Sequence, residues 1–115
     1  MISDQQLRAF DVIVVPFPYS ERLAEKRRPA VVVSNDRLHR EGFLWIAMIT
    51  GAGKAARTGV VPIQVLSAAG LPGASIVRTL KVATVEPERI LRKIGRLADR
   101  EHVAVKRALA SFLAE

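Results

Sequence analysis

The sequence predicts a small, mainly β domain, a barrel or a sandwich, closed by one C-terminal helix. Short runs rich in valine and isoleucine recur as far as Leu97, and turns containing glycine or proline separate them. The hydrophobic period then changes from that of strands to that of a helix. No internal repeat or linker divides the chain, so we expect one domain over residues 1–115.

The composition limits the classes of function. A chain of 115 residues, half of them hydrophobic, can bury roughly two thirds of its unfolded surface. Its formal charge of +7 favours a polyanionic partner, which can be nucleic acid, an acidic protein segment or an anionic membrane surface. The chain has no cysteine and only two, widely separated histidines, so we expect no disulfide, no metal site and no cofactor. Without a leader or a membrane-length apolar run, a cytoplasmic protein is expected.

The predicted strands follow one another with little space between them. The first, over residues 11–18, ends at two prolines, which limit its pairing. The runs at 29–34 and 44–50 are apolar without alternation, which is typical of burial on both faces. Alternation of apolar and basic residues makes 91–97 a half-exposed last strand. The remaining short strands are expected at 60–65, 75–79 and 81–85, with a turn or single helical turn over 66–73.

The last segment has helical spacing. Asp99 is the expected N-cap of a helix over residues 100–113. One face of this helix would carry His102, Val105, Leu109 and Phe112 and pack on the β domain.

A paired cation precedes the second strand. Pro29 has no backbone N–H, so it belongs at the beginning of a strand and keeps Arg28 out of the helical region. Arg28 is therefore expected at a strand entrance, where its five donors could hold a phosphate. A solvated surface arginine is the alternative reading of the same residues.

Several other candidate residues have simpler roles. Residues 51–54 lack the Walker pattern and are expected to form a loop rim. His39 is expected in a surface loop and Trp45 in the core, whereas Tyr19 could stack on a base. The polar residues expected at strand ends, which a barrel rim could bring together, are Tyr19, Ser20, Glu21, Arg28, Thr50 and Arg78.

These residues resemble the MazF/PemK-like toxin endoribonucleases of bacterial toxin–antitoxin pairs. The specific part is the Arg-Pro strand entrance with Ser-Asn-Asp behind it, at residues 27–36; weaker matches are residues 11–14, 16–20, 47–50, 75–78 and 94–97. The resemblance implies an SH3-like barrel with a C-terminal helix. It further implies a homodimer that cleaves single-stranded RNA without a metal and that an acidic cognate antitoxin holds inactive.

The resemblance also assigns site residues. The catalytic arginine before the proline corresponds to Arg28, and the catalytic threonine at the end of the third strand corresponds to Thr50. Ser20 and Glu21 would assist them. Contacts to the RNA are expected from Tyr19, Lys26, Arg27, Lys54, Arg57 and Arg78. Two positions depart from the family pattern, which commonly has glycine where Phe10 stands and serine where Gly51 stands.

Two other functions fit the same fold. A topoisomerase poison of the CcdB type would act through an interface centred on the C-terminal helix and would not need Arg28 or Thr50. A non-catalytic nucleic-acid-binding barrel would account for the positive charge but not for the arginine and threonine at strand ends.

Overall fold

The computed structural model describes residues 7–16, 27–53 and 58–115, and its secondary structure is dominated by strands. The elements in chain order are β1 (Asp11–Pro16), β2 (Arg27–Val32), α1 (Asp36–Arg40), β3 (Leu44–Gly51), β4 (Val60–Ile63), α2 (Leu66–Ala69), β5 (Ser75–Val85), the 3-10 turn η2 (Pro87–Arg89), β6 (Arg92–Arg96) and α3 (Asp99–Ala110).

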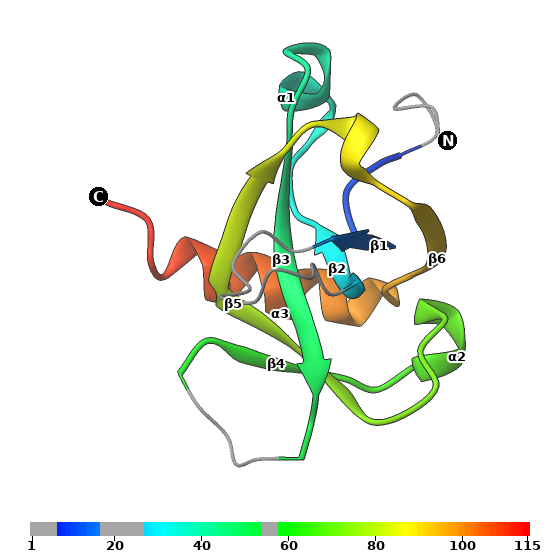
Figure 1. The fold of residues 1–115 in the computed structure, drawn as a ribbon. Helices are drawn as coiled ribbons and strands as arrows, with labels where there is room; N and C mark the ends of the chain where they lie inside the picture. The colour runs from blue at the N-terminus through cyan, green and yellow to red at the C-terminus, as the bar shows by residue number, and fades with distance from the viewer. Residues whose placement is uncertain (1–6, 17–26, 54–57) are drawn as a thin grey trace.

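The strands form one antiparallel sheet in the order β4-β5-β3-β2-β1-β6. The sheet curls into a half-barrel, and α3 lies behind it in the view of Figure 1. This arrangement confirms the predicted barrel with a C-terminal helix.

The sheet buries apolar side chains on both faces. Alternate residues of the same strands point in opposite directions, so Ile13, Ala30 and Ile46 belong to one core, whereas Val12 and Val31 belong to the other. The second core is covered by α3, whose Val105 is fully buried. The unbroken apolar runs of the sequence are thus explained by two separate cores.

A single strand, β5, replaces the two short strands predicted at 75–79 and 81–85. At the point where two strands were predicted to meet, the pairing of β5 with β3 shifts instead. Ala47 of β3 pairs with Val82, but the next residue, Met48, pairs with Arg78. The residues between them bulge, and the Thr79 hydroxyl donates to the Gly59 carbonyl. The strand therefore bends and continues into the next part of the barrel.

Two expectations about side chains were wrong. Trp45 is 48% exposed, because alternation along β3 turns it away from the core to which Leu44 and Ile46 belong. His39 is buried on α1, a short helix where a connection was expected, and Asn35 caps this helix by accepting from two backbone N–H groups.

The beginning of α3 also differs from the prediction. Asp99 is the first helical residue, and Ala98 occupies the N-cap position. The buried Glu101 carboxylate accepts from the backbone N–H of Ala98 at 3.2 Å, and it also accepts from those of Gln64 and Val65. One side chain thus both caps the helix and fixes it to the segment after β4.

Buried charges hold the N-terminal end of β1. Asp11 is fully buried, and its carboxylate lies 3.1 Å from Arg96 Nη1 and 3.2 Å from Lys93 Nζ. The same carboxylate accepts from the backbone N–H of Arg8 at 2.9 Å. The preceding residue, Phe10, has φ of +73° and stacks on His102 with a centroid distance of 4.1 Å. His102 is therefore packed against the domain, as predicted.

Candidate functional site

β2 places Arg28 at the end of the sheet opposite to Asp11. The strand begins with the two arginines, and Arg28 pairs with Val15 of β1. Pro29 is tolerated one residue later because the hydrogen-bonded pairing of β2 with β3 begins only at Ala30. The Arg28 side chain is partly buried, so it is not the fully solvated arginine of the alternative reading.

Thr50 lies at the end of the neighbouring strand. Ala30 of β2 pairs with Met48 of β3, and this is the last pair of the two strands, so Arg28 and Thr50 each lie two residues beyond it at the same end of the sheet. Residues two apart along a strand point to the same face, so both side chains lie on the face of Ala30 and Met48. The two residues come from positions 22 apart in sequence, and only the sheet topology brings them together.

Arg78 of β5 extends this polar surface. It pairs with Met48 on one side and with Val60 on the other, and it therefore lies on the same face as Thr50. Together, Arg28, Thr50 and Arg78 form a partly buried polar group across three adjacent strands. We call these three residues the rim site.

The rim site carries two positive charges that no carboxylate of the described residues compensates. Among the described residues, neither Arg28 nor Arg78 has a carboxylate within ion-pair distance. An unpaired guanidinium that lies partly out of water is prepared to bind an anion, because binding restores the partner that it lacks. The hydroxyl of Thr50 adds a neutral donor between the two cations.

The other predicted site residues are distributed differently. Arg27 is described, but it alternates with Arg28 and so lies on the opposite face of β2. Six others lie outside the described residues: Tyr19, Ser20, Glu21, Lys26, Lys54 and Arg57.

Sequence reasoning missed Arg92, which pairs across β6 with Val14 of β1. Arg92 and Arg27 line the same cavity, on the face of the sheet opposite to the rim site. The signal was present in the alternation of apolar and basic residues over 91–97, which was interpreted only as a half-exposed strand.

In the described part of the chain, no cluster of three or more acidic or histidine side chains is arranged to hold a metal ion. The described residues also contain no helix that is long and apolar enough to cross a membrane.

The chain belongs to the family described as PemK-like, MazF-like toxins of type II toxin–antitoxin systems, whose model matches residues 8–113. The family resemblance found in the sequence is thereby confirmed. A curated relative, the probable endoribonuclease MazF of Mycolicibacterium smegmatis, is 30% identical over 88 residues, which cover 76% of this chain and 81% of the relative.

Solved structures of MazF proteins share the fold. The Mycobacterium tuberculosis toxin MazF-mt6 has a TM-score of 0.70 and 19% identity, with coverage of 88% of this chain and 93% of that one. A mycobacterial endoribonuclease in complex with its cognate antitoxin has a TM-score of 0.73 and 15% identity, covering 91% and 92% of the two chains. MazF in a MazE–MazF complex from Deinococcus radiodurans has a TM-score of 0.71 and 16% identity, covering 94% and 95%.

Proposed function

We propose that Arg28 and Thr50 form the catalytic centre of this MazF-like toxin endoribonuclease, which cleaves single-stranded RNA without a metal ion. The observation that supports this assignment is the placement of both residues at neighbouring strand ends on one sheet face. The family and the positive charge of Arg28 and Arg78 in the rim site support this substrate class.

The proposed reaction is an intramolecular transesterification. The ribose 2′-oxygen forms a bond to the adjacent phosphorus and loses its proton, and the bond from phosphorus to the 5′-oxygen breaks. The products are a 2′,3′-cyclic phosphate and a 5′-hydroxyl that takes up a proton. Arg28 stabilises the charge that develops on the phosphorane, and Thr50 donates a hydrogen bond to it. Arginine is a poor proton carrier, so Glu21 with Ser20 is proposed to assist the proton transfers.

Further contacts would position the RNA. Arg78 lies beside the catalytic pair and is proposed to bind a neighbouring phosphate. Lys26, Lys54 and Arg57 are proposed as additional backbone contacts, and Tyr19 as a stacking platform for a base.

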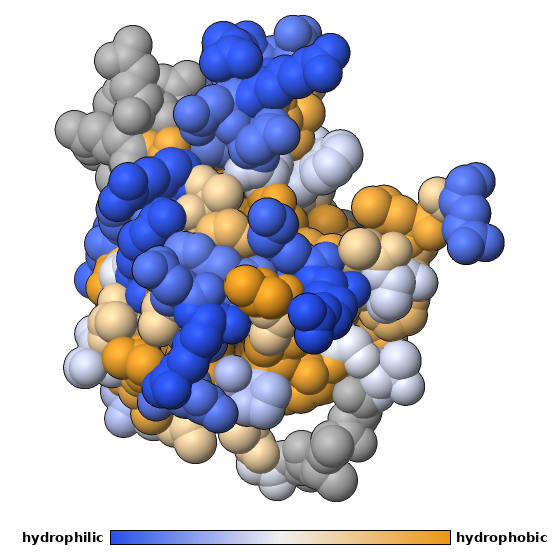
Figure 2. Space-filling view, turned by 180° about the vertical axis from the view of Figure 1, so that it is seen from behind, coloured by the Kyte–Doolittle hydropathy of each residue, from blue (hydrophilic) through white to orange (hydrophobic). Residues whose placement is uncertain are grey.

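The proposed assembly is a cytoplasmic homodimer, one domain per chain, that an acidic cognate antitoxin inhibits. Exposed apolar side chains support a protein interface, because Leu80, Phe112 and Leu113 are 56%, 47% and 70% exposed. Leu80 and Phe112 both border the turn at Gly59, so they lie near each other. Figure 2 shows the side of the molecule that carries α3, where hydrophobic surface interrupts the charged surface.

Incubation of the purified chain with mixed-sequence single-stranded RNA and DNA in EDTA tests the proposal. We expect cleavage of RNA only, with cyclic phosphate ends, and loss of cleavage in Arg28→Ala and Thr50→Ala. If folded wild-type protein leaves diverse RNAs intact, the proposal fails, and a gyrase assay then tests the topoisomerase-poison alternative.

A further inference from the structure

A second cationic site lies on the face of the sheet opposite to the rim site. It is a cavity of about 540 Å³ between the β1, β2 and β6 strands and the turn after α2. We call it the reverse groove, and the lining residues used here are Arg27, Pro29, Leu71, Leu91, Arg92 and Ile94. We propose that the reverse groove binds an acidic segment with aliphatic side chains, supplied by the antitoxin; the identity of the partner rests on the proposed function.

The strand register brings the two arginines to one groove. Val14 of β1 pairs with Arg92 on one side and with Pro29 on the other, so these three residues form a row across three strands. Such a row spans about 10 Å from outer strand to outer strand. Arg27 lies two residues from Pro29 on the same face of β2. An extended arginine side chain spans most of the distance from Arg27 to the row that contains Pro29. Both guanidinium groups can therefore reach the same carboxylate or two consecutive ones.

The described residues of the reverse groove supply two cations and no balancing carboxylate. Arg27 and Arg92 are exposed, and among the described residues no carboxylate forms an ion pair with either. The part of the lining that the structure describes includes no aspartate or glutamate. The neighbouring Lys93 differs, because it is paired with the buried Asp11 at 3.2 Å. A partner with carboxylates would supply the missing countercharge.

Between the arginines, the lining is aliphatic. Leu71 and Ile94 are buried or partly buried, whereas Leu91 is 42% exposed at the surface of the groove. Burial of leucine or valine side chains from a partner would cover this exposed area. The groove therefore offers both apolar contact and two forked cations, which suit a peptide with alternating acidic and aliphatic residues.

The same composition disfavours RNA. Single-stranded nucleic acid binds by stacking its bases on aromatic rings beside a cationic track. Among the described residues that line the reverse groove, none is aromatic. An RNA strand would leave the leucine side chains facing a charged backbone, so the groove favours a peptide.

The position of the groove suggests a route to inhibition. Arg27 lies in the reverse groove and Arg28 lies in the rim site, and the two are consecutive residues of β2. A peptide bound by Arg27 would thus lie at the strand end that presents the catalytic arginine. From there, the partner chain can pass over the sheet end to the rim site without a long connection.

The test uses the full chain, labelled with nitrogen-15, and three probes. These are a synthetic peptide of Glu-Leu-Ser repeats, the same peptide with glutamine for glutamate, and a non-cleavable single-stranded oligonucleotide with 2′-methoxy groups. We expect the acidic peptide to shift the amide resonances of Leu71, Leu91 and Ile94, and the glutamine peptide to shift them much less. The oligonucleotide should shift those of Thr50 and Gly51.

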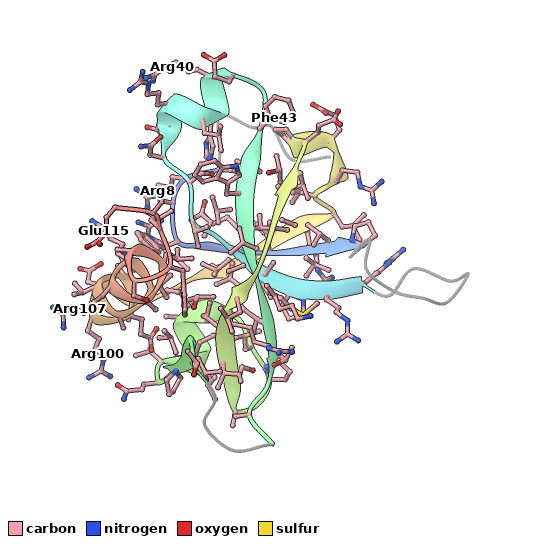
Figure 3. The ribbon with its side chains drawn as sticks, turned by 90° about the vertical axis from the view of Figure 1, so that its left-hand side faces the viewer. Arg8, Arg40, Phe43, Arg100, Arg107 and Glu115 are labelled. Atoms are coloured by element: carbon pink, nitrogen blue, oxygen red, sulfur yellow. The ribbon has the colours of Figure 1, made fainter. Side chains whose placement is uncertain are left out.

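Variants connect the shifts to charge. Arg92→Gln should weaken binding of the acidic peptide about tenfold, which is the effect expected for the loss of one charge-assisted hydrogen bond. Arg100→Gln is the matched control, because Arg100 is exposed on α3, which Figure 3 shows apart from β2, and is not among the described residues that line the groove. It removes the same charge and should change peptide affinity much less.

Each contrary result has its own meaning. Equal weakening by Arg92→Gln and Arg100→Gln would overturn the groove and leave only an effect of net charge. A larger loss of oligonucleotide affinity than of peptide affinity in Arg92→Gln would assign the groove to nucleic acid. Absence of peptide binding in a chain that cleaves RNA would overturn the groove alone. Peptide bound in the groove of a chain that cleaves no RNA would overturn the proposed function alone.

Discussion

The two ends of β1 and β2 use positive charge in opposite ways. At the Asp11 end, Lys93 and Arg96 converge on one buried carboxylate. At the other end, Arg27 and Arg28 have no such partner among the described residues. A cation paired in the folded chain contributes to structure, whereas an unpaired one is available to a ligand. Ion pairing therefore distinguishes the cations that hold β1 in place from the arginines that we propose to bind ligands.

The largest effect on stability is expected from removing the carboxylate of Asp11, which pairs with two cations at its end of the sheet. Asp11→Ala leaves Lys93 and Arg96 without their shared carboxylate and Arg8 without the acceptor for its N–H. Both cations are about one third exposed, so we expect a loss near the lower limit of the range of roughly 3–5 kcal/mol for a broken buried pair. Urea denaturation measures the loss. Unchanged stability would mean that pairing at this end is not structural.

Arg28→Ala should reduce RNA cleavage strongly and leave the stability of the fold almost unchanged, the opposite of Asp11→Ala. We expect RNA cleavage to fall by about 10²–10³-fold, the usual effect of removing a donor that stabilises transition-state charge. The free energy of unfolding should change by less than about 0.5 kcal/mol, because Arg28 forms no ion pair with any described residue. Single-turnover cleavage and urea denaturation of the same preparation give both values. Arg28→Lys separates charge from geometry, since lysine keeps the charge but lacks the fork.

The positive φ of Phe10 provides a smaller test of the paired end. Phe10→Ala removes the stack on His102 but keeps an unfavourable backbone, and it should lose about 1–2 kcal/mol. Phe10→Gly also loses the stack, but glycine adopts φ of +73° without strain. We expect the glycine variant to be about 1 kcal/mol more stable than the alanine variant by thermal denaturation. An alanine variant as stable as the glycine variant, or more stable, would show that the positive φ at residue 10 carries no strain.

The smallest expected effect is on the salt dependence of RNA binding. Arg78→Gln should weaken RNA binding at all sequences and reduce the slope of log affinity against log salt by about 0.7, as expected for one lost phosphate contact to a single strand. Fluorescence anisotropy at several salt concentrations measures this slope, with Arg100→Gln as the control for net charge. An unchanged slope would remove Arg78 from the rim site.

Much of this fold could be predicted from the sequence, because apolar runs and turn residues act locally. Pro29 marked the strand entrance, and the heptad-like spacing around Val105 marked α3. The bulge in β5 was not predictable, since it depends on the pairing of Met48 with a distant strand. Trp45 was misassigned for a similar reason: an unbroken apolar run does not show which alternate residue the neighbouring elements leave uncovered.

The candidate site was predicted less completely than the fold. Arg28 and Thr50 could be named through the family resemblance, but their common face follows only from the register of β2 and β3. The sequence showed that Phe10 stands where the family commonly has glycine. Only the structure shows why glycine suits this position, because Phe10 adopts φ of +73°. Arg92 was missed because nothing in a basic strand residue indicates whether a carboxylate will meet it.

The wall of the reverse groove contains Gly70, whose backbone rests directly on that of Ile94. An added Cβ at Gly70 would overlap the Ile94 carbonyl, and one at Gly95 would overlap the backbone of Ala69. The separation of α2 from β6 is therefore fixed by main chain rather than by rotamers. This wall of the groove therefore cannot move to fit different partners. Discrimination between related partners must come from the few side chains that line the groove.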